Sequence, residues 1–270
     1  MIVLQQVDAV EDIAGLKKAY LRSLVAPQDC YWETAVIGLA PHIILTVNGQ
    51  AVGYCAINKA DCLLEFYVNS PALAAELFAT VLTERGVKTA VAGTNDPFYL
   101  SLCLDRQQKV AVNTYLFHVL EPLPTNPSPG TIFRLGMQTD LAALVDFYGR
   151  NNEYEDTESI EAGFGGRQQY AQDLINKGQV FLLTEGPAII GIGECRFSVS
   201  QPVYADIGMI VEREQRRCGW GTQLLRQLGS YCKQHGRQPI CSCAADNIAS
   251  RKAIEKAGFV AQHRLLDIWF

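Results

Sequence analysis

The sequence predicts an α/β chain of the α+β kind, folded as two domains of similar plan that each carry a mixed, mostly antiparallel sheet flanked by helices. The chain has 270 residues, which is more than one compact domain usually holds. A proline-rich segment, "EPLPTNPSPG" (121–130), has the composition of a linker. The predicted order of elements is the same on each side of this linker. Antiparallel strands come first, and a strand, a helix, a strand, a short helix and a closing strand follow them.

The first half is expected to begin its sheet with a hairpin, in which Asn48 and Gly49 form the turn. Its predicted strands are 42–47, 50–57, 63–68 and 87–93, with a helix over 71–85 and a closing strand over 112–120. The second half has predicted strands at 131–136, 179–185, 188–199, 203–211, 239–245 and 263–270. Its predicted helices are 139–148, 167–176, 220–235 and 247–257.

Helix 220–235 has the clearest pattern, because its apolar residues fall on one face and Gly236 suits its C-terminal end. The apolar residues are Leu224, Leu225, Leu228, Tyr231 and Cys232.

Composition excludes several classes of function. The net charge of −5 is unsuited to a nucleic-acid backbone, and no apolar run approaches the roughly 18 residues of a membrane span. The nine cysteines form no CxxC pair, and the four histidines form no metal-binding pattern. We therefore expect a cytoplasmic protein with reduced thiols, no resident metal, no nucleic-acid partner and no membrane contact. A homodimer is the candidate assembly.

The stretch "QRRCGWGTQLL" (215–225) lies where a predicted strand hands over to helix 220–235. Helix N-termini present unpaired backbone N–H groups and a positive dipole, so they bind anions. Gly219 and Gly221 let an anion approach the backbone, and Arg216 and Arg217 add charge. A surface connection eased by glycines is the alternative. Neither a dinucleotide fingerprint nor a P-loop fits, because the third glycine and the lysine of those motifs are not present.

The stretch "MIVEREQRRCGWGTQLL" resembles the acyl-CoA-binding signature of the GNAT superfamily of N-acyltransferases, in which Arg216, Gly219 and Gly221 stand at the signature positions. The family's second signature, an Asn-led helix ending in Gly-Phe, has its counterpart in "DNIASRKAIEKAGF". The resemblance implies acetyl-CoA as cosubstrate, held in a gap beside a splayed strand. The binding residues that it implies are Met209, Ile210, Val211, Arg216, Arg217, Cys218, Gly219, Trp220, Gly221, Thr222, Asn247 and Ser250. Within this set, Cys218 and Trp220 are interpreted as spacers.

Acyl transfer to an amine needs a group that removes a proton, because an alkylammonium titrates near pH 10. Glu194 is the first candidate for this base and Asp206 the second, since they lie on adjacent predicted strands. A structural ion pair is the alternative for each. Family members often carry a tyrosine seven residues after the motif asparagine as the acid for the leaving thiolate, and Ile254 stands there. The acid for the leaving thiolate would then be Tyr154 or a water molecule, or the acidity of the thiol itself would make an acid unnecessary.

The resemblance implies that the acidic segment "NNEYEDTES" (151–159) borders the acceptor pocket. Glu153 and Tyr154 are therefore candidate substrate-binding residues that favour a cationic acceptor, and a solvated loop is the alternative.

In the first half, no glycine cradle follows Val68. We interpret residues 1–120 as a degenerate GNAT-like domain that walls the acceptor cleft, 121–130 as a linker, and 131–270 as the catalytic domain.

Two functions follow from these patterns. The first is an N-acetyltransferase that moves an acetyl group from acetyl-CoA to a primary amine of a small molecule, by direct attack with a carboxylate or water as base. The second is a non-catalytic acyl-CoA-binding sensor or scaffold protein.

Overall fold

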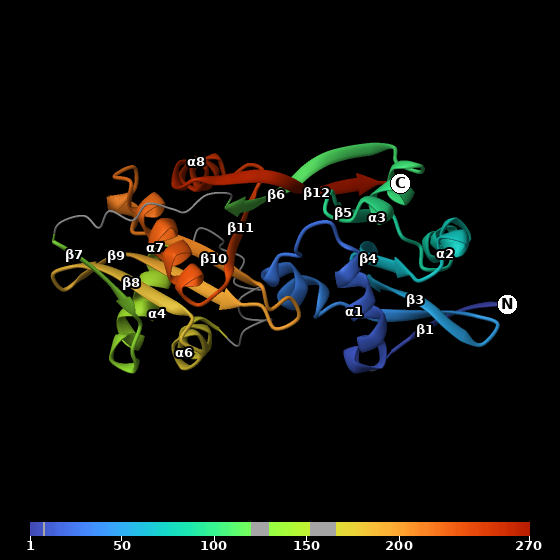
Figure 1. Cartoon of the computed structure of the whole chain (residues 1–270), viewed down its shortest axis with the longest axis horizontal. Coiled ribbons are helices and arrows are strands. Elements are labelled where there is room, and N and C mark those ends of the chain that lie inside the picture. Colours follow the sequence, from blue (N-terminus) through green and yellow to red (C-terminus); the bar gives the residue numbers. More distant parts are fainter. Residues whose placement is uncertain (8, 120–129, 152–165) are drawn as a thin grey trace. The chain divides into compact units, whose positions relative to one another are not determined.

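The computed structural model describes residues 1–7, 9–119, 130–151 and 166–270, and it confirms the predicted fold class. The chain forms two compact units: unit 1 contains Met1–Leu116 and Gln262–Phe270, and unit 2 contains Phe117–Ala261. Figure 1 labels the elements of both units. Among the described helices, none is long and apolar enough to cross a membrane.

Unit 1 is a mixed sheet with helices on both faces. Its strands lie in the order β1-β2-β3-β4-β5-β12-β6. Their bounds are Ile2–Gln6 (β1), His42–Val47 (β2), Gln50–Ile57 (β3), Cys62–Val68 (β4), Thr89–Gly93 (β5), Lys109–Val119 (β6) and Phe259–Trp269 (β12). The end of β6, from Phe117, and the start of β12, up to Ala261, belong to unit 2. The helices are Ala14–Ser23 (α1), Pro71–Glu84 (α2) and Pro97–Leu104 (α3), with a π-helical turn over Trp32–Ile37. The hairpin at Asn48 and Gly49 is confirmed, and both residues have positive φ.

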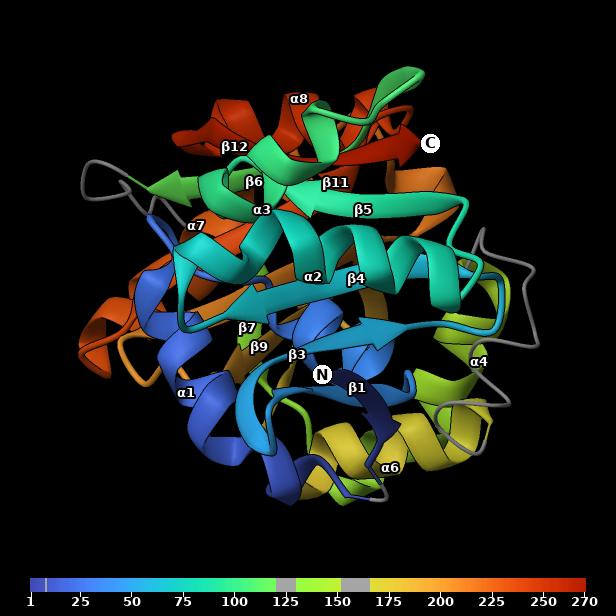
Figure 2. The same ribbon diagram turned by 90° about the vertical axis from the view of Figure 1, so that its right-hand side faces the viewer.

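The two faces of this sheet are covered differently. Helices α2 and α3 bring Leu77, Phe78 and Tyr99 onto one face, and Figure 2 shows α2 lying across β4. Helix α1 packs Tyr20 against Tyr54 on the other face. The sequence patterns did not predict β1, α1 or the π-helical turn, because these segments show no sustained apolar period.

Strand β12 changes the predicted domain boundary. The closing strand was expected to complete the second half, yet Leu265–Trp269 pair antiparallel with Gly93–Thr89 of β5. Ile268 is fully buried in the core of unit 1. Residues 262–270 therefore belong structurally with the first half of the chain.

Unit 2 is a five-stranded sheet in the order β11-β10-β9-β8-β7. Its strands are Thr131–Leu135 (β7), Val180–Glu185 (β8), Ala188–Phe197 (β9), Tyr204–Val211 (β10) and Gln238–Ala244 (β11). Its helices are Leu141–Asn151 (α4), Arg167–Asn176 (α6), Trp220–Gln234 (α7) and Ile248–Ala257 (α8), with short 3-10 turns over Gln138–Asp140 and Arg213–Gln215. Helix α4 begins and ends later than predicted, and the other helices start within a residue of their predicted positions.

Helix α7 packs closely against β9. A Cβ atom on Gly193 would come within 2.7 Å of Leu228, and one on Gly191 within 2.8 Å of Leu224. These two glycines let the helix approach the strand backbone. Helices α4 and α6 cover the opposite face, where Leu144 and Leu174 pack with Ile192.

Asp96 makes unit 1 sensitive to pH. Burial raises its pKa to about 6, although the N–H of Tyr99 and the hydroxyl of Tyr20 partly offset the effect. Because the folded pKa lies above the ordinary value of 3.8, the folded state holds the proton more tightly, and stability falls as pH rises from about 4 through about 6. We expect Asp96→Asn to flatten this part of the profile and to stabilise unit 1 at pH 7 by about 2 kcal/mol.

Asparagine can still accept the N–H of Tyr99 as the helix cap, so the substitution removes the charge and keeps the capping geometry. Denaturant unfolding of unit 1 at several pH values measures the effect. Asp105→Asn, at the exposed end of α3, is the control. An unchanged slope in the Asp96 variant would show that other groups, such as the buried Glu65, dominate the profile.

Candidate functional site

The strands β10 and β11 separate along their length. They run parallel and pair over Tyr204–Asp206 with Gln238–Ile240. Strand β10 continues to Val211 and β11 to Ala244, so the pairing ends while both strands go on. On its other side β10 stays paired with β9 as far as Val211. Beyond Asp206, this edge of β10 pairs with no strand of the described residues and is open in that sense, as the family resemblance predicts.

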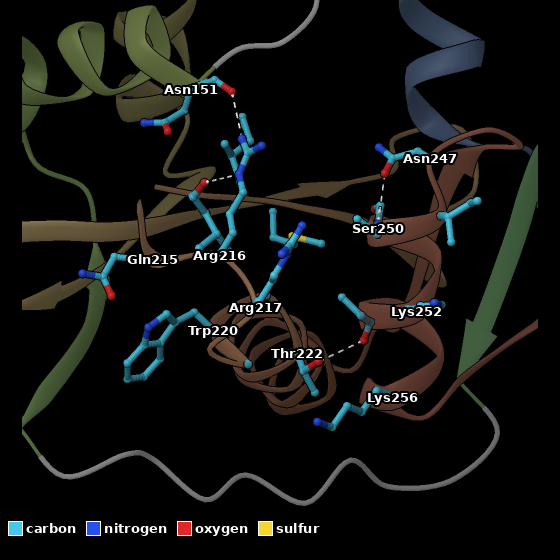
Figure 3. A pocket seen from close by; sticks show the side chains of 18 residues that line it. Asn151, Gln215, Arg216, Arg217, Trp220, Thr222, Asn247, Ser250, Lys252 and Lys256 are labelled. Carbon is cyan, nitrogen blue, oxygen red and sulfur yellow. Dashed lines mark hydrogen bonds between the residues drawn. The ribbon is translucent and has the colours of Figure 1, made fainter. Parts of the chain in front are cut away.

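A cavity of about 860 Å³ lies at this open edge (Figure 3). Its walls come from the end of β10, the turn before α7, the first turn of α7 and one face of α8. The lining residues that the sequence analysis named are Met209, Ile210, Val211, Arg216, Arg217, Gly219, Trp220, Gly221, Thr222, Asn247 and Ser250. Cys218 is the exception: it is exposed, and its Sγ lies 3.7 Å from the carbonyl oxygen of Arg216.

The turn before α7 has the backbone geometry of an anion cradle. Gly219, the N-cap residue, adopts φ +90° and supplies no side-chain cap. The N–H groups of the first turn therefore remain available to a ligand. A Cβ on Gly221 would lie 3.2 Å from Met209 Sδ and 3.6 Å from Ala253 Cβ, so β10, α7 and α8 meet closely at this residue.

Arg217 also adopts a left-handed conformation, with φ +68°. Such a conformation costs a non-glycine residue about 1 kcal/mol or more. We expect Arg217→Gly to raise the stability of unit 2 by about 0.5–1 kcal/mol and to weaken the binding of an anionic ligand, because the strain and the charge disappear together. Thermal unfolding and calorimetry with acetyl-CoA measure the two effects. Loss of stability in this variant would contradict the assignment of strain.

Arg216 is held by the protein. Its Nε donates to the carbonyl oxygen of Val211 at 3.3 Å, and its Nη2 to that of Asn151 at 3.5 Å (Figure 3). Asn151 is buried at the end of α4 and accepts the N–H of Arg213 at 2.8 Å through Oδ1. Asn151 thus connects α4 to the cradle, which the sequence analysis missed. Glu153 and Tyr154, the predicted acceptor residues, lie outside the described residues.

Helix α8 forms the second wall. Asn247 caps it by accepting the N–H of Ser250 at 3.0 Å, and Thr222 donates to the carbonyl oxygen of Ala253 at 3.3 Å. Lys252 and Lys256 also line the cavity and were not predicted. A pair of lysines four residues apart is typical of any solvated helix face, so their spacing does not distinguish a binding site from a solvated surface. The described residues that line the cavity include four cationic side chains and no carboxylate, in a chain of net charge −5.

Glu194 lies on β9, an inner strand, and points to the face covered by α4 and α6. Its carboxylate accepts the hydroxyl of Tyr148 at 2.6 Å and that of Tyr170 at 2.8 Å, and it forms an ion pair with Arg196. Arg196 also donates to the hydroxyl oxygen of Tyr170 at 2.7 Å. Burial and the charge of Glu194 raise the pKa of both tyrosines, so their hydroxyls stay protonated. Asp206, also buried, lies opposite Arg196 in the β9–β10 ladder.

The two predicted bases therefore sit together, in an ordered cluster that does not line the cavity. The residue opposite Glu194 in the ladder is Gly208, which precedes the cavity-lining Met209. Among the described residues, none has an atom within 4 Å of a Cβ placed on Gly208. Ile254 is 2% exposed and packs inward from α8, so its position offers no group to the cavity.

Unit 1 has a different arrangement at the equivalent strands. Strands β4 and β5 pair in parallel at Cys62 and Leu63. Tyr99 of α3 lies against these strands: it donates its hydroxyl to the carbonyl oxygen of Leu63 at 3.0 Å and packs against Phe66 and Phe78. The cavity that Tyr99 helps to line has a volume of about 30 Å³. Helix α2 begins at Pro71 without a preceding glycine cradle, as predicted.

Comparisons with known proteins agree with this geometry. Residues 9–119 match a family model described as "Acetyltransferase (GNAT) domain", and residues 142–259 match one described as "Acetyltransferase (GNAT) family". No curated protein matches the chain significantly.

Solved structures with a similar fold span nearly the whole chain. A GNAT-family acetyltransferase from Colwellia psychrerythraea is 28% identical, with a TM-score of 0.89 and 99% coverage of both chains. A tandem GNAT protein of the clavulanic acid biosynthesis pathway is 15% identical, with a TM-score of 0.65, covering 99% of this chain and 98% of its own. A GCN5-related N-acetyltransferase from Sphaerobacter thermophilus is 15% identical, with a TM-score of 0.67, covering 99% of this chain and 94% of its own. With a GNAT domain in each half, the chain belongs to the GNAT acetyltransferases of tandem architecture.

Proposed function

We propose that this protein is an N-acetyltransferase that moves an acetyl group from acetyl-CoA to a primary amine of a small molecule, and that unit 2 performs the reaction. The observation that carries the proposal is the cation-lined cavity at the open edge of β10, reached by the uncapped N-terminus of α7. An anionic, elongated cofactor fits this combination of a phosphate cradle and a strand edge.

Each part of the cavity has a role toward acetyl-CoA. The backbone N–H groups of the turn and of the first turn of α7, together with Arg217, would hold the pyrophosphate. Arg216 would keep the turn in shape through its bonds to Val211 and Asn151. The open edge of β10 at Met209–Val211 would orient the pantetheine arm, with Asn247 and Ser250 on the facing wall. When bound, acetyl-CoA supplies an acetyl group activated as a thioester.

The acceptor amine would enter over Gly208. No atom of the described residues lies within 4 Å of a Cβ placed there, and Gly208 is the residue opposite Glu194 in the β9–β10 ladder. Because an amine is protonated at neutral pH, a neighbouring group must take its proton before attack. Glu194 is our first candidate, acting directly or through a water molecule, and Asp206 is the second. To bind the amine, Glu194 would have to give up the hydrogen bond from Tyr148 or the one from Tyr170.

Calorimetry with acetyl-CoA, followed by a thiol-release assay over a panel of small amines, tests the proposal. We expect acetyl-CoA to bind and at least one amine to be acetylated. The second candidate function, a non-catalytic acyl-CoA sensor, is favoured by the complete engagement of the Glu194 carboxylate. Binding without turnover on any amine would support the sensor, and the absence of binding would exclude both functions.

Gly208 provides a test of the acceptor path. We expect Gly208→Leu to lower kcat/KM for the amine by about 100-fold, because the side chain fills the space beside Glu194, while the affinity for acetyl-CoA changes little. Steady-state kinetics and calorimetry measure the two quantities. Gly208→Ala is the graded control and should cost much less. Equal kinetics in the leucine variant would show that the acceptor enters elsewhere.

Unit 1 would bind no cofactor, because no glycine cradle precedes α2 and the cavity that Tyr99 helps to line has a volume of only about 30 Å³. The protein would act in the cytoplasm on a small amine, and it would bind neither nucleic acid nor a membrane. It would assemble as a homodimer, which light scattering tests.

A further inference from the structure

Two lysines on α8 face the cavity together. Lys252 and Lys256 are four residues apart, so their side chains lie on one face of the helix, one turn from each other (Figure 3). Both are exposed and both line the cavity. The neighbouring charges of α8 behave differently, because Arg251 pairs with Glu255 at 2.8 Å. Among the ion pairs of the described residues, none uses the ammonium group of Lys252 or Lys256.

The helix that carries these lysines is fixed to α7. Arg226 of α7 donates to the carbonyl oxygen of Lys256 at 2.9 Å, and Thr222 donates to that of Ala253 at 3.3 Å. The lysines therefore form a second positively charged site. The contacts between α7 and α8 fix its position relative to the first site, at the N-terminus of α7. One cavity thus offers two places for an anion, on two different elements.

Acyl-CoA carries its phosphates in two places, a pyrophosphate on the ribose 5′ position and a monophosphate on the 3′ position of the same ribose. The cradle before α7 accounts for the pyrophosphate. A phosphate monoester is close to dianionic at pH 7, because its second pKa is about 6. It is the remaining strongly charged group of the cofactor, and the lysines of α8 are the remaining cations among the described residues that line the cavity.

We propose that Lys252 and Lys256 bind the 3′-phosphate of acyl-CoA, so that the protein selects CoA over its 3′-dephospho form. This inference rests on the proposed function, since it assigns a specificity to the same cavity. The recognition is electrostatic, so it weakens as ionic strength rises.

Calorimetry with acetyl-CoA and with 3′-dephospho-acetyl-CoA tests the inference on the full chain. We expect the unmodified protein to bind the dephospho form about tenfold more weakly. The double variant Lys252→Gln and Lys256→Gln should lose about tenfold in affinity for acetyl-CoA and should bind the two ligands almost equally. The control variant Lys59→Gln and Lys177→Gln removes two exposed charges away from the cavity and should keep the discrimination.

The outcomes separate this inference from the proposed function. If acetyl-CoA binds but the dephospho form binds equally well, the lysines do not read the 3′-phosphate, and the cofactor assignment stands. If the double variant lowers the affinity for both ligands by the same factor, the lysines attract the pyrophosphate or act only through their long-range charge, and the inference is wrong. If the unmodified protein binds neither ligand, the proposed function itself is overturned.

Discussion

Gly221→Glu is expected to lower the affinity for acetyl-CoA by about 100-fold or more, and to abolish turnover at ordinary cofactor concentrations. The added side chain would start within 3.2 Å of Met209 and 3.6 Å of Ala253, so it must turn into the cavity. Its carboxylate would then stand at the positive end of α7, where the pyrophosphate is expected to bind, and would repel it. Calorimetry and the thiol-release assay measure the two effects.

Two further variants show whether charge or volume is responsible. Gly221→Ala adds a single methyl group, which the flexible end of Met209 can accommodate by shifting a few tenths of an ångström. We expect it to lose less than about tenfold in affinity. Gln234→Glu places the same charge at the far end of α7 and should leave binding unchanged. Full affinity in Gly221→Glu would show that the pyrophosphate does not lie on this turn.

Arg196→Met is expected to destabilise unit 2 by about 3 kcal/mol, because it leaves the carboxylate of Glu194 largely buried without its counter-charge. The substitution keeps an unbranched side chain of similar length, so the loss of charge dominates. The double variant Glu194→Gln and Arg196→Met should recover most of this stability, since it removes both charges. Denaturant unfolding followed by hydrogen exchange in β9 measures each variant.

The same set of variants decides the role of Glu194. If this carboxylate is the base, Glu194→Gln lowers turnover by about 100-fold or more and leaves acetyl-CoA affinity unchanged, and the double variant stays inactive. If the carboxylate is a structural partner of Arg196, the double variant regains activity together with stability. In that case Asp206 becomes the candidate base, and Asp206→Asn is the next variant to assay.

Local patterns predicted those parts of the site that lie close together in sequence. The two glycines and the arginine of the turn specify a backbone conformation, and Asn247 caps the helix that it begins, as its position in the second signature implies. Such features depend on neighbouring residues. For that reason the turn, α7 and α8 were expected in the right places.

Features that depend on distant partners were not predictable from these patterns. The surroundings of Glu194 come from α4, α6 and its own strand, and nothing in "GIGECRF" indicates that Tyr148 and Tyr170 donate to it. Asn151 looks like the start of a polar loop, yet it is buried and supports Arg213 and Arg216. The pattern of residues 263–270 predicts a strand correctly, but a strand pattern does not state which sheet receives it.

Strand β12 also sets an order of events during synthesis. Ile268 completes the core of unit 1, and Leu265–Trp269 form one flank of β5, so the sheet of unit 1 cannot close until the ribosome has translated past all of unit 2. The unit that is synthesised first is therefore the one that finishes folding last, contrary to the usual progress of domains from the N-terminus. A premature stop codon after Ala261 would consequently damage the N-terminal half, and it would leave every described residue that lines the cavity in place.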